Sequence, residues 1–441
     1  MRVNIIGAGL AGCECANILA RNNVDVTLID MKPSKKSEAH IEDNFGELVC
    51  SNSLKSSNVT NACGLLKEEM KTFGSLMLEA AEKSKLDAGQ ALAVDRKIFS
   101  EYITEKIKSY SNITVVSKEV TDITEYINRE DEITVVATGP LTTDGLTNSL
   151  RQYLDIENLY FYDAEAPIID KESIDMEKAY FMDRYGKEGE GAYLNLSMTK
   201  DEYYAFYNAL ITAESANRHE FDKLMLFEGC MPIEEMAKRG EKTLTFGMLK
   251  PVGLVKEESK GKVYAVVQLR KEDEEAKAYN MVGFQTSLKF SEQERVFRMI
   301  PGLENAEFLR YGVMHRNTYI NGGKLLNSNF SLKKNNNIYF AGQISGVEGY
   351  VESAMSGMIV ALDIIARLNN RKVEFTTETM MGALSRYIST ENENYQPMNA
   401  NFGIIKGLDE KIKDKKEKYT RYAKRSLNEI SRVREEMDYL R

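Results

Sequence analysis

Two cysteines stand in surroundings that favour reactive thiols. Cys50 lies in a polar run, residues 48–55, that also holds serine, asparagine and lysine. Cys230 lies in residues 227–235, where a glycine and a proline predict a turn before a short helix. A thiol beside a cation or at a helix N-terminus forms more of the nucleophilic thiolate. Both cysteines are therefore candidates for catalysis, while their composition alone also allows two buried small residues.

The other cysteines predict neither disulfides nor a metal site. Cys13 and Cys15 fall on a predicted helix and Cys63 near a turn, and all three are interpreted as structural. Five cysteines in 441 residues are too few for a disulfide framework, which favours a reducing, cytoplasmic compartment. The sequence contains no CxxC pair, and its three histidines do not cluster with the cysteines. We therefore expect no bound metal.

Glycines near the N-terminus follow a pattern typical of dinucleotide binding. Residues 3–6 predict a buried strand, residues 7–12 read Gly-Ala-Gly-Leu-Ala-Gly, and a helix is expected to follow. Gly7 permits the tight turn, Gly9 lets backbone N–H groups approach a pyrophosphate, and Gly12 lets the helix pack on the strand. The positive end of the helix dipole favours phosphate. The predicted cofactor-binding residues of this turn are Gly7, Ala8, Gly9, Leu10, Ala11 and Gly12.

An acidic residue follows at the distance that such a site requires. Residues 24–29 predict a second strand that ends in Asp30. A carboxylate at this position accepts hydrogen bonds from ribose hydroxyls. Asp30 is therefore a further predicted cofactor ligand.

Two later strands with glycine tips favour FAD over a nicotinamide cofactor. Residues 133–136 lead to Gly139, and residues 338–340 lead through further glycines into a helix over 350–368. Three such tips predict an α/β, glutathione-reductase-like, doubly wound FAD-binding fold with an inserted α+β domain. The helix starting at residue 350 could stabilise negative charge on a reduced flavin. The cofactor residues predicted from these strands are Gly139, Gly342, Gln343, Gly346 and Gly349.

This organisation predicts three segments. Residues 1–165 form the first part of the FAD-binding domain, and residues 166–327 form an inserted domain that faces substrate or RNA. Residues 328–441 complete the FAD-binding domain and end in a basic helix. Within the insertion, helices are expected over about residues 200–213 and 291–299.

The charge and hydropathy of the chain exclude two broad classes. Lys and Arg number 58 against 67 Asp and Glu, so the net charge of −9 argues against coating nucleic acid through bulk charge. Polar residues and glycines interrupt the apolar N-terminus, which argues against a signal peptide. No run of about 18 apolar residues occurs, so we expect no membrane span.

Several long strings occur in a distinctive order. They are GAGLAG (7–12), LVCSNSL (48–54), AGQALAVDR (88–96), FYDAEAPI (161–168), FEGCMPIEEMAKRG (227–240), KPVGL (250–254), YAVVQLR (264–270), FRMIPGLENAEFLRYGVMHRNT (297–318), FAGQISGVEGYVESA (340–354) and QPMNANFG (396–403). Over nearly its whole length the chain thus resembles the FAD- and folate-dependent tRNA (uracil-5-)-methyltransferases called TrmFO. It departs from their pattern at Asp30-Met31-Lys32-Pro33, where Glu-Met-Arg-Pro is usual, and at Asp87, which replaces a proline.

The resemblance implies a reaction. The methylene group of 5,10-methylenetetrahydrofolate would pass to C5 of the T-loop uridine of tRNA, with reduced FAD as carrier and reductant and NAD(P)H as the electron source. Uracil C5 becomes nucleophilic once a thiolate adds to C6, and a second group must then remove the C5 proton. By resemblance Cys230 is the nucleophile and Cys50 the proton acceptor or a stabilising group, and an exchange of these roles stays open. No membrane and no protein partner is implied.

RNA binding requires positive charge and stacking surfaces. Residues 411–425 hold eight Lys or Arg against Asp414 and Glu417, with Tyr419 and Tyr422 interleaved. A solvated charged helix is the alternative for this segment. The predicted RNA contacts are Lys415, Lys416, Lys418 and Arg421, with Arg310, His315 and Arg316 as a second group.

Three rival functions stay open on the sequence alone. The same chemistry could act on a uridine of 23S ribosomal RNA, because some proteins that resemble this family do so. A flavin oxidoreductase could use Cys50 and Cys230 as a disulfide-forming redox pair on a small molecule. A non-catalytic RNA-binding flavoprotein would tolerate the loss of either cysteine.

Overall fold

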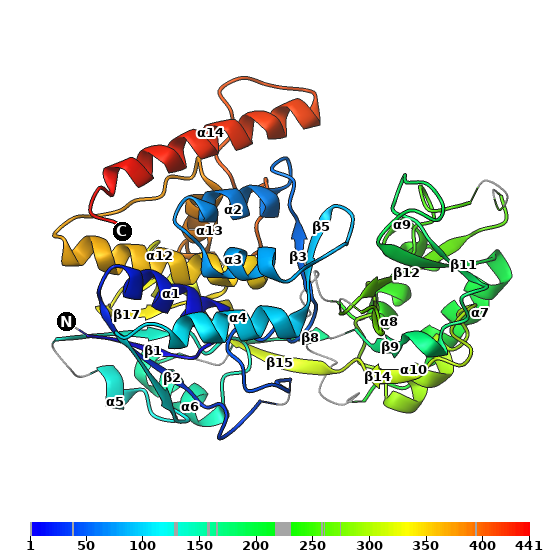
Figure 1. Cartoon of the computed structure of the whole chain (residues 1–441), viewed down its shortest axis with the longest axis horizontal. Helices are drawn as coiled ribbons and strands as arrows, with labels where there is room; N and C mark the ends of the chain where they lie inside the picture. The colour runs from blue at the N-terminus through cyan, green and yellow to red at the C-terminus, as the bar shows by residue number, and fades with distance from the viewer. Residues whose placement is uncertain are drawn as a thin grey trace.

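Two sheets with separate apolar cores organise the chain (Figure 1). The computed structural model describes residues 2–37, 39–127, 131–156, 159–164, 166–216, 231–256, 259, 261–273, 275–392 and 395–441, with the backbone alone for 159–164, 315 and 316. We call the larger body around the first sheet the first lobe. The smaller body around the second sheet, within residues 168–310, is the second lobe.

The first sheet has the order β16-β17-β7-β1-β2-β6, and all its strands except β16 run parallel. Ile5 of the central strand pairs with Leu28 on one side and Val135 on the other. Such β-branched apolar runs suit strands that are covered on both faces. The strands are β1 (Arg2–Ile6), β2 (Asp25–Asp30), β6 (Ile113–Ser117), β7 (Glu132–Val136), β16 (Ser331–Leu332) and β17 (Asn335–Phe340).

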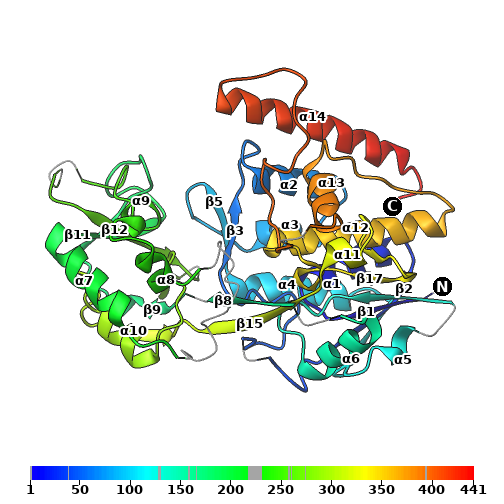
Figure 2. The same ribbon diagram turned by 180° about the vertical axis from the view of Figure 1, so that it is seen from behind.

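Helices cover both faces of this sheet, with α1, α3, α4 and α12 on one side and α5 and α6 on the other (Figures 1 and 2). Side chains cap several of them; Asp95, for example, accepts hydrogen bonds from two N–H groups of the first turn of α4. The helices of this lobe are α1 (Leu10–Arg21), α2 (Ala62–Lys71), α3 (Leu76–Lys83), α4 (Arg96–Lys108), α5 (Thr124–Ile127), α6 (Asp144–Leu154), α11 (Gly322–Leu325), α12 (Tyr350–Leu368), α13 (Met380–Ile388) and α14 (Lys415–Glu436).

The second sheet has the order β10-β11-β12-β13-β9-β14, with antiparallel neighbours. One face is apolar and packs on helices, as Leu269, Phe206 and Val296 of one core show. Because side chains alternate along a strand, Gln268 and Arg270 lie on the opposite, polar face. The elements are β9 (Ile168–Asp170), β10 (Ala179–Phe181), β11 (Tyr193–Met198), β12 (Ala265–Lys271), β13 (Ala278–Met281), β14 (Phe308–Arg310), α7 (Lys200–Thr212), α8 (Ile233–Lys238), α9 (Thr243–Phe246) and α10 (Phe290–Phe297), with a 3-10 turn at Lys171–Ser173.

Two small sheets lie where the lobes meet. The strands β8 (Leu159–Ala164) and β15 (Met314–Tyr319) pair antiparallel and link the lobes (Figure 2). The strands β3 (Ser53–Ser56), β4 (Lys85–Leu86) and β5 (Ala91–Val94) follow the Cys50 run, and a 3-10 turn at Gln343–Ser345 precedes α12. The second sheet falls within the predicted insertion 166–327. The boundaries of that insertion stay predictions, because residue 165 lies outside the described residues.

The elements expected from the sequence are present. The strand–glycine–helix unit at the N-terminus and the helix over 350–368 are both confirmed, and α7 and α10 match the two helices predicted within the insertion. Among the helices in the described part of the chain, none combines the length and apolar character that a membrane span needs.

The contact between α1 and α12 generates a prediction about stability. A Cβ at Gly357 of α12 would overlap the Ala11 carbonyl oxygen of α1. Gly357→Ala should therefore lower the thermal unfolding midpoint, because overpacking against backbone costs about 1–3 kcal/mol. The gain in helix propensity is only about 0.5–1 kcal/mol. Gly407→Ala is the control, because a Cβ at Gly407 meets no atom within 4 Å. Equal midpoints for the two variants would contradict the prediction.

Candidate active site

The N-terminal turn works only with glycine. Gly7 follows β1 with φ of 105°, and a Cβ there would overlap the Ala137 carbonyl oxygen beside β7. A Cβ at Gly12 would overlap the Gly7 carbonyl oxygen. These close approaches let the first turn of α1 pack directly on the backbone that follows β1 and β7. The sequence predicts this role for Gly12.

The same turn leaves an open cradle above it. A Cβ at Gly9 or at Gly139 would meet nothing within 4 Å. Gly9 is the N-cap of α1, and no side chain caps the helix. The first backbone N–H groups of α1 therefore face a space that an anion can enter.

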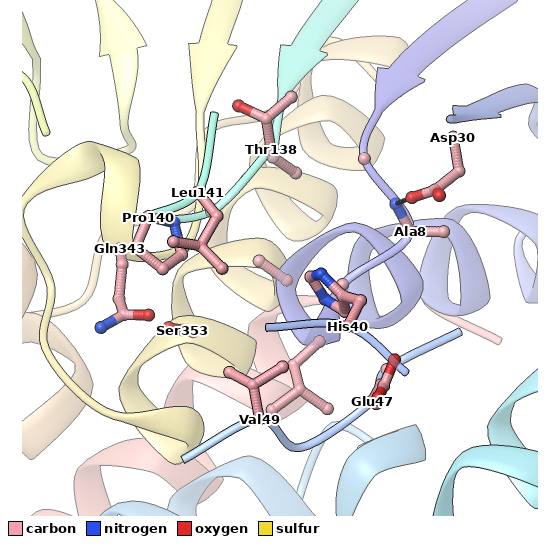
Figure 3. A pocket seen from close by; sticks show the side chains of 18 of the residues that line it. Ala8, Asp30, His40, Glu47, Val49, Thr138, Pro140, Leu141, Gln343 and Ser353 are labelled. Carbon is pink, nitrogen blue, oxygen red and sulfur yellow. Dashed lines mark hydrogen bonds between the residues drawn. The ribbon is translucent and has the colours of Figure 1, made fainter. Parts of the chain in front are cut away.

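Asp30 braces this turn. Its carboxylate accepts hydrogen bonds from the Ala8 N–H at 2.7 Å and the Lys32 N–H at 2.9 Å. Figure 3 shows the carboxylate beside the Ala8 backbone nitrogen. A carboxylate has about four lone-pair sites, so acceptor capacity is left for a ribose hydroxyl.

A cavity lies beside the glycine turn (Figure 3). Of the predicted cofactor residues, the ones that line it are Gly7, Ala8, Gly9, Leu10, Ala11, Asp30, Gly139, Gly342 and Gln343. Gly12 does not line the cavity, because it is packed under the turn. Gly346 and Gly349 also lie off it, and a Cβ at either would overlap a side chain, Tyr395 and Glu352 respectively. Their positive φ angles show backbone roles in the turn that leads into α12.

Six polar residues that the sequence did not single out as ligands also line the cavity: Lys32, His40, Glu47, Thr138, Tyr350 and Ser353. Lys32 and Glu47 form a buried ion pair, with Nζ and Oε2 3.7 Å apart. His40 Nδ1 lies 2.6 Å from the Ser37 hydroxyl, and Tyr350 stands at the start of α12. Lys32 could have been predicted as a lining residue, because it is a basic residue two positions after Asp30. Local sequence carried no such signal for Tyr350.

Tyr350 holds the Cys50 loop at the rim of this cavity. Its hydroxyl oxygen accepts hydrogen bonds from the Cys50 N–H at 2.8 Å and the Ser51 N–H at 3.2 Å. Both lone pairs are then used, so the hydroxyl proton is left to donate to Cys50 Sγ, 3.1 Å away. Burial beside Cys50 raises the pKa of Tyr350 well above its ordinary value, which keeps this proton in place. The arrangement stabilises a Cys50 thiolate.

Arg96 fixes the same loop from α4. Its guanidinium donates to the carbonyl oxygens of Leu48 at 2.9 Å and Val49 at 3.2 Å. It also forms an ion pair with Glu272 of the second lobe, with Nε and Oε2 2.9 Å apart. Burial lowers the pKa of Arg96, but the Glu272 carboxylate offsets this and holds the pKa above its ordinary value. Val49 lines the cavity, so the loop contacts the Arg96 guanidinium through its carbonyl oxygens and the cavity through Val49.

Cys230 lies outside the described residues, so its role as the nucleophile stays a prediction. The helix expected after it is confirmed as α8, with Glu234 and Glu235 in the first turn. Glu234 is buried and accepts hydrogen bonds from the Thr286 hydroxyl at 2.9 Å and the Ser287 N–H at 2.7 Å. Burial raises the pKa of Glu234 above its ordinary value, and the hydrogen bonds from Ser287 offset only part of this rise. The helix that follows Cys230 is thus fixed to the second lobe.

The predicted RNA contacts fall in two separate places. Arg310 of β14 donates from Nη1 to the Val49 carbonyl oxygen at 3.0 Å, so it lies beside the Cys50 loop. His315 and Arg316 belong to β15, where only their backbone is described. An RNA role for these three residues stays a prediction.

The second group lies on α14, across the outer side of the first lobe (Figure 1). The lysines of its first turns are at the end of the helix nearer the second lobe, and Arg421 pairs with Glu417 and Glu410. The interleaved tyrosines differ from the expectation: Tyr422 is buried, and both rings pack against Phe402 at 4.4 and 5.6 Å. The Tyr422 ring is buried in the apolar contact between α14 and Phe402, so this ring is not exposed for a base to stack on.

Comparisons with known proteins agree with this geometry. The family model described as glucose inhibited division protein A matches residues 2–372. A relative from Fusobacterium nucleatum subsp. nucleatum, named methylenetetrahydrofolate–tRNA-(uracil-5-)-methyltransferase TrmFO, is 55% identical over 427 residues, covering 96% of this chain and 97% of the relative. A relative of the same name from Caldicellulosiruptor bescii is 54% identical over 431 residues, covering 97% and 98%. A crystal structure of Aquifex aeolicus GidA has a TM-score of 0.72 at 16% identity, covering 98% of this chain and 73% of that chain.

The fold and the glycine-lined cavity define a protein of the FAD-binding, doubly wound α/β class, as the sequence predicts. The sequence identity of 55% and 54% to the two relatives, over nearly the whole chain, identifies the family within this class. The chain belongs to the TrmFO family, and the resemblance inferred from its motifs is confirmed.

The contact between Tyr350 and Cys50 can be tested directly. Tyr350→Phe removes the proton donated to Sγ and the acceptor of two N–H groups. A hydrogen bond to a charged group is worth about 1.5–3 kcal/mol, so alkylation of Cys50 by iodoacetamide at pH 7 should slow about tenfold or more. Peptide mass spectrometry measures the rate at Cys50. Tyr110→Phe, which removes a hydroxyl bonded to Asn17, is the control. An unchanged rate in Tyr350→Phe would show that the hydroxyl does not stabilise the thiolate.

Proposed function

We propose that this protein is a folate-dependent tRNA (uracil-5-)-methyltransferase. The observation that carries the proposal is the junction of two sites. Tyr350 lines the glycine-floored cavity and at the same time binds Cys50. Relatives at 55% and 54% identity bear the name of this activity.

The cavity suits FAD. Gly9 and Gly139 leave space where a side chain would block a close approach of pyrophosphate, and the first N–H groups of α1 point there. Asp30 would accept from the ribose while it braces the turn. Gly342 and Gln343 would contact the cofactor from the second strand tip. Bound in its reduced form, FAD would supply the carrier for the one-carbon unit of methylenetetrahydrofolate and the electrons needed to reduce that unit to a methyl group.

The chain's own residues activate the base. The Cys230 thiolate would add to C6 of uracil, and the electron pair displaced from the C5–C6 bond makes C5 the nucleophile. After C5 gains the one-carbon group, its proton must leave, and the C6–S bond then breaks to restore the ring. Cys50 would take this proton, because the Tyr350 hydroxyl stabilises its thiolate form until the proton arrives.

Several finer points belong to the same proposal. The target is the T-loop uridine of tRNA, reached by a docking surface that includes Arg310, His315, Arg316 and the basic start of α14. NAD(P)H resupplies electrons, the protein works in the cytoplasm, and it needs no protein partner. Relatives named for tRNA favour tRNA over 23S ribosomal RNA and over a small-molecule disulfide reaction.

One assay tests the reaction and its target. Purified flavoprotein receives methylenetetrahydrofolate labelled in its methylene group, NADPH, and unmodified transcripts of tRNA or 23S ribosomal RNA. Label should enter tRNA with the native protein. Cys230→Ala and Cys50→Ala should each fall below about one hundredth of the native rate, because each lacks one catalytic group. The rate is measured as label retained in purified RNA.

The control for this assay is Cys63→Ala, which removes a buried thiol away from the cavity lining and should keep its activity. Label in ribosomal RNA alone would show that the substrate is ribosomal RNA and not tRNA. No label in either RNA would refute the methyltransferase function.

The cradle yields a separate prediction. Gly9 has an extended backbone that any residue adopts, with φ of −74° and ψ of −173°. Gly9→Ala should therefore fold normally, yet place a methyl group where the pyrophosphate approaches. FAD binding, measured by flavin fluorescence titration, should weaken about tenfold or more, which is about 1.4 kcal/mol. The thermal midpoint of the apoprotein should match that of Gly407→Ala. Unweakened FAD binding would show that the pyrophosphate does not approach this turn.

A further inference from the structure

The Cys50 loop is also held from the second lobe, by the polar face of its sheet. Arg270 of β12 lies opposite Asn280 of β13, on the face turned away from the apolar core. Its guanidinium donates from Nε to Asn52 Oδ1 at 2.8 Å and from Nη2 to Ser51 Oγ at 2.9 Å. Arg270 therefore binds the two residues that directly follow Cys50.

Asn52 completes a clamp with the same strand. Its side-chain Nδ2 donates to the Lys271 carbonyl oxygen at 2.8 Å. Asn52 is fully buried and Arg270 is 6% exposed, so these hydrogen bonds are shielded from water. Removing one partner would leave a buried polar group without a hydrogen bond, which destabilises this arrangement of the loop. The amide of Asn52 is thus fixed by two consecutive residues of β12.

Other groups face the loop from neighbouring elements. Tyr350 of α12 contacts the thiol, Arg96 of α4 and Arg310 of β14 bind carbonyl oxygens before it, and Glu272, directly after β12, neutralises Arg96. Arg270, by contrast, binds two neutral side chains through the described contacts. Its positive charge is therefore held at the side chains of Ser51 and Asn52, the two residues after Cys50, without a carboxylate at those two bonds. A cation so placed favours an anion in the same loop.

We propose that Arg270 is a positioning residue for Cys50. Through Asn52 and Ser51 it fixes the loop so that the Cys50 sulfur stays at the Tyr350 hydroxyl, and the placement of the second lobe thereby sets the reactivity of a thiol carried by the first. The inference rests on the proposed function only in that Cys50 is taken as a reacting group.

The test uses the full-length, FAD-loaded protein and the pH dependence of Cys50 alkylation by iodoacetamide. The pH midpoint reports the thiolate fraction, whereas the plateau rate at high pH reports access to the thiol. Arg270→Met should raise the midpoint by about one pH unit. The substitution removes the positive charge of Arg270, and a loop that is no longer fixed moves the Cys50 sulfur away from the Tyr350 hydroxyl. Arg270→Lys keeps the charge and loses the two-pronged donor, so its midpoint should fall between those of the native protein and Arg270→Met.

A matched control separates positioning from general stability. Arg298 lies in the same lobe and donates a hydrogen bond to the Ala306 carbonyl oxygen at 2.9 Å, away from the Cys50 loop. Arg298→Met should leave the midpoint unchanged. Flavin absorbance and the thermal midpoint of each variant establish that it is folded and loaded, and Arg270→Lys serves if Arg270→Met does not fold.

A double-mutant cycle tests the route. If Arg270 acts through Asn52, then Arg270→Met combined with Asn52→Ala should shift the midpoint no more than the larger single change. Additive shifts, or a native midpoint in both Arg270 variants, would overturn the proposal. Because alkylation needs no RNA, a shifted midpoint without RNA methylation would instead refute the proposed function alone.

Discussion

The close approach of α1 to the first sheet is the constraint on which the rest of the site depends. Gly7 and Gly12 let backbone meet backbone, and any Cβ at these positions would overlap a carbonyl oxygen. The approach aims the uncapped start of α1 into the cavity and leaves open space at Gly9. Gly357 extends the same requirement to α12, whose first residue, Tyr350, contacts the Cys50 loop. The cavity and the Cys50 loop therefore depend on one packing arrangement.

The Cys50 loop is held by hydrogen bonds from both lobes. A cysteine on a free loop would have ordinary reactivity and no fixed direction. In this protein, hydrogen bonds from α12 and α4 hold the loop on the side of the first lobe, and β12 and β14 hold it on the other. Several of these contacts are charged and buried, so each depends on its partner being in place. A change in the position of the second lobe would reach the thiol through a few identified bonds.

The distribution of charge bears on the proposed docking of RNA. The chain is acidic overall, yet cations gather at the start of α14, on the side of the first lobe nearer the second lobe. General attraction to RNA is therefore weak, and docking would depend on where these cations lie. The Tyr422 ring is buried against Phe402, so the lysines at the start of α14 stay the predicted RNA contacts there.

Local patterns in the sequence were sufficient for the glycine turn, Asp30, the strand tips and most helices, because backbone conformation and burial period are encoded within a few residues. They also predict Cys50 and Cys230 as candidate catalytic residues, and both roles stay predictions. They could not identify Tyr350 or Arg270, which bind the Cys50 loop from 300 and about 220 residues away. Nor could they show that the Tyr422 ring, interleaved among the cations of α14, is buried against Phe402. The sequence by itself determined which groups could react and where the cofactor turn lies. Only the tertiary structure decided which distant side chains hold the thiol, because such contacts follow from the packing of whole elements and leave no local periodicity.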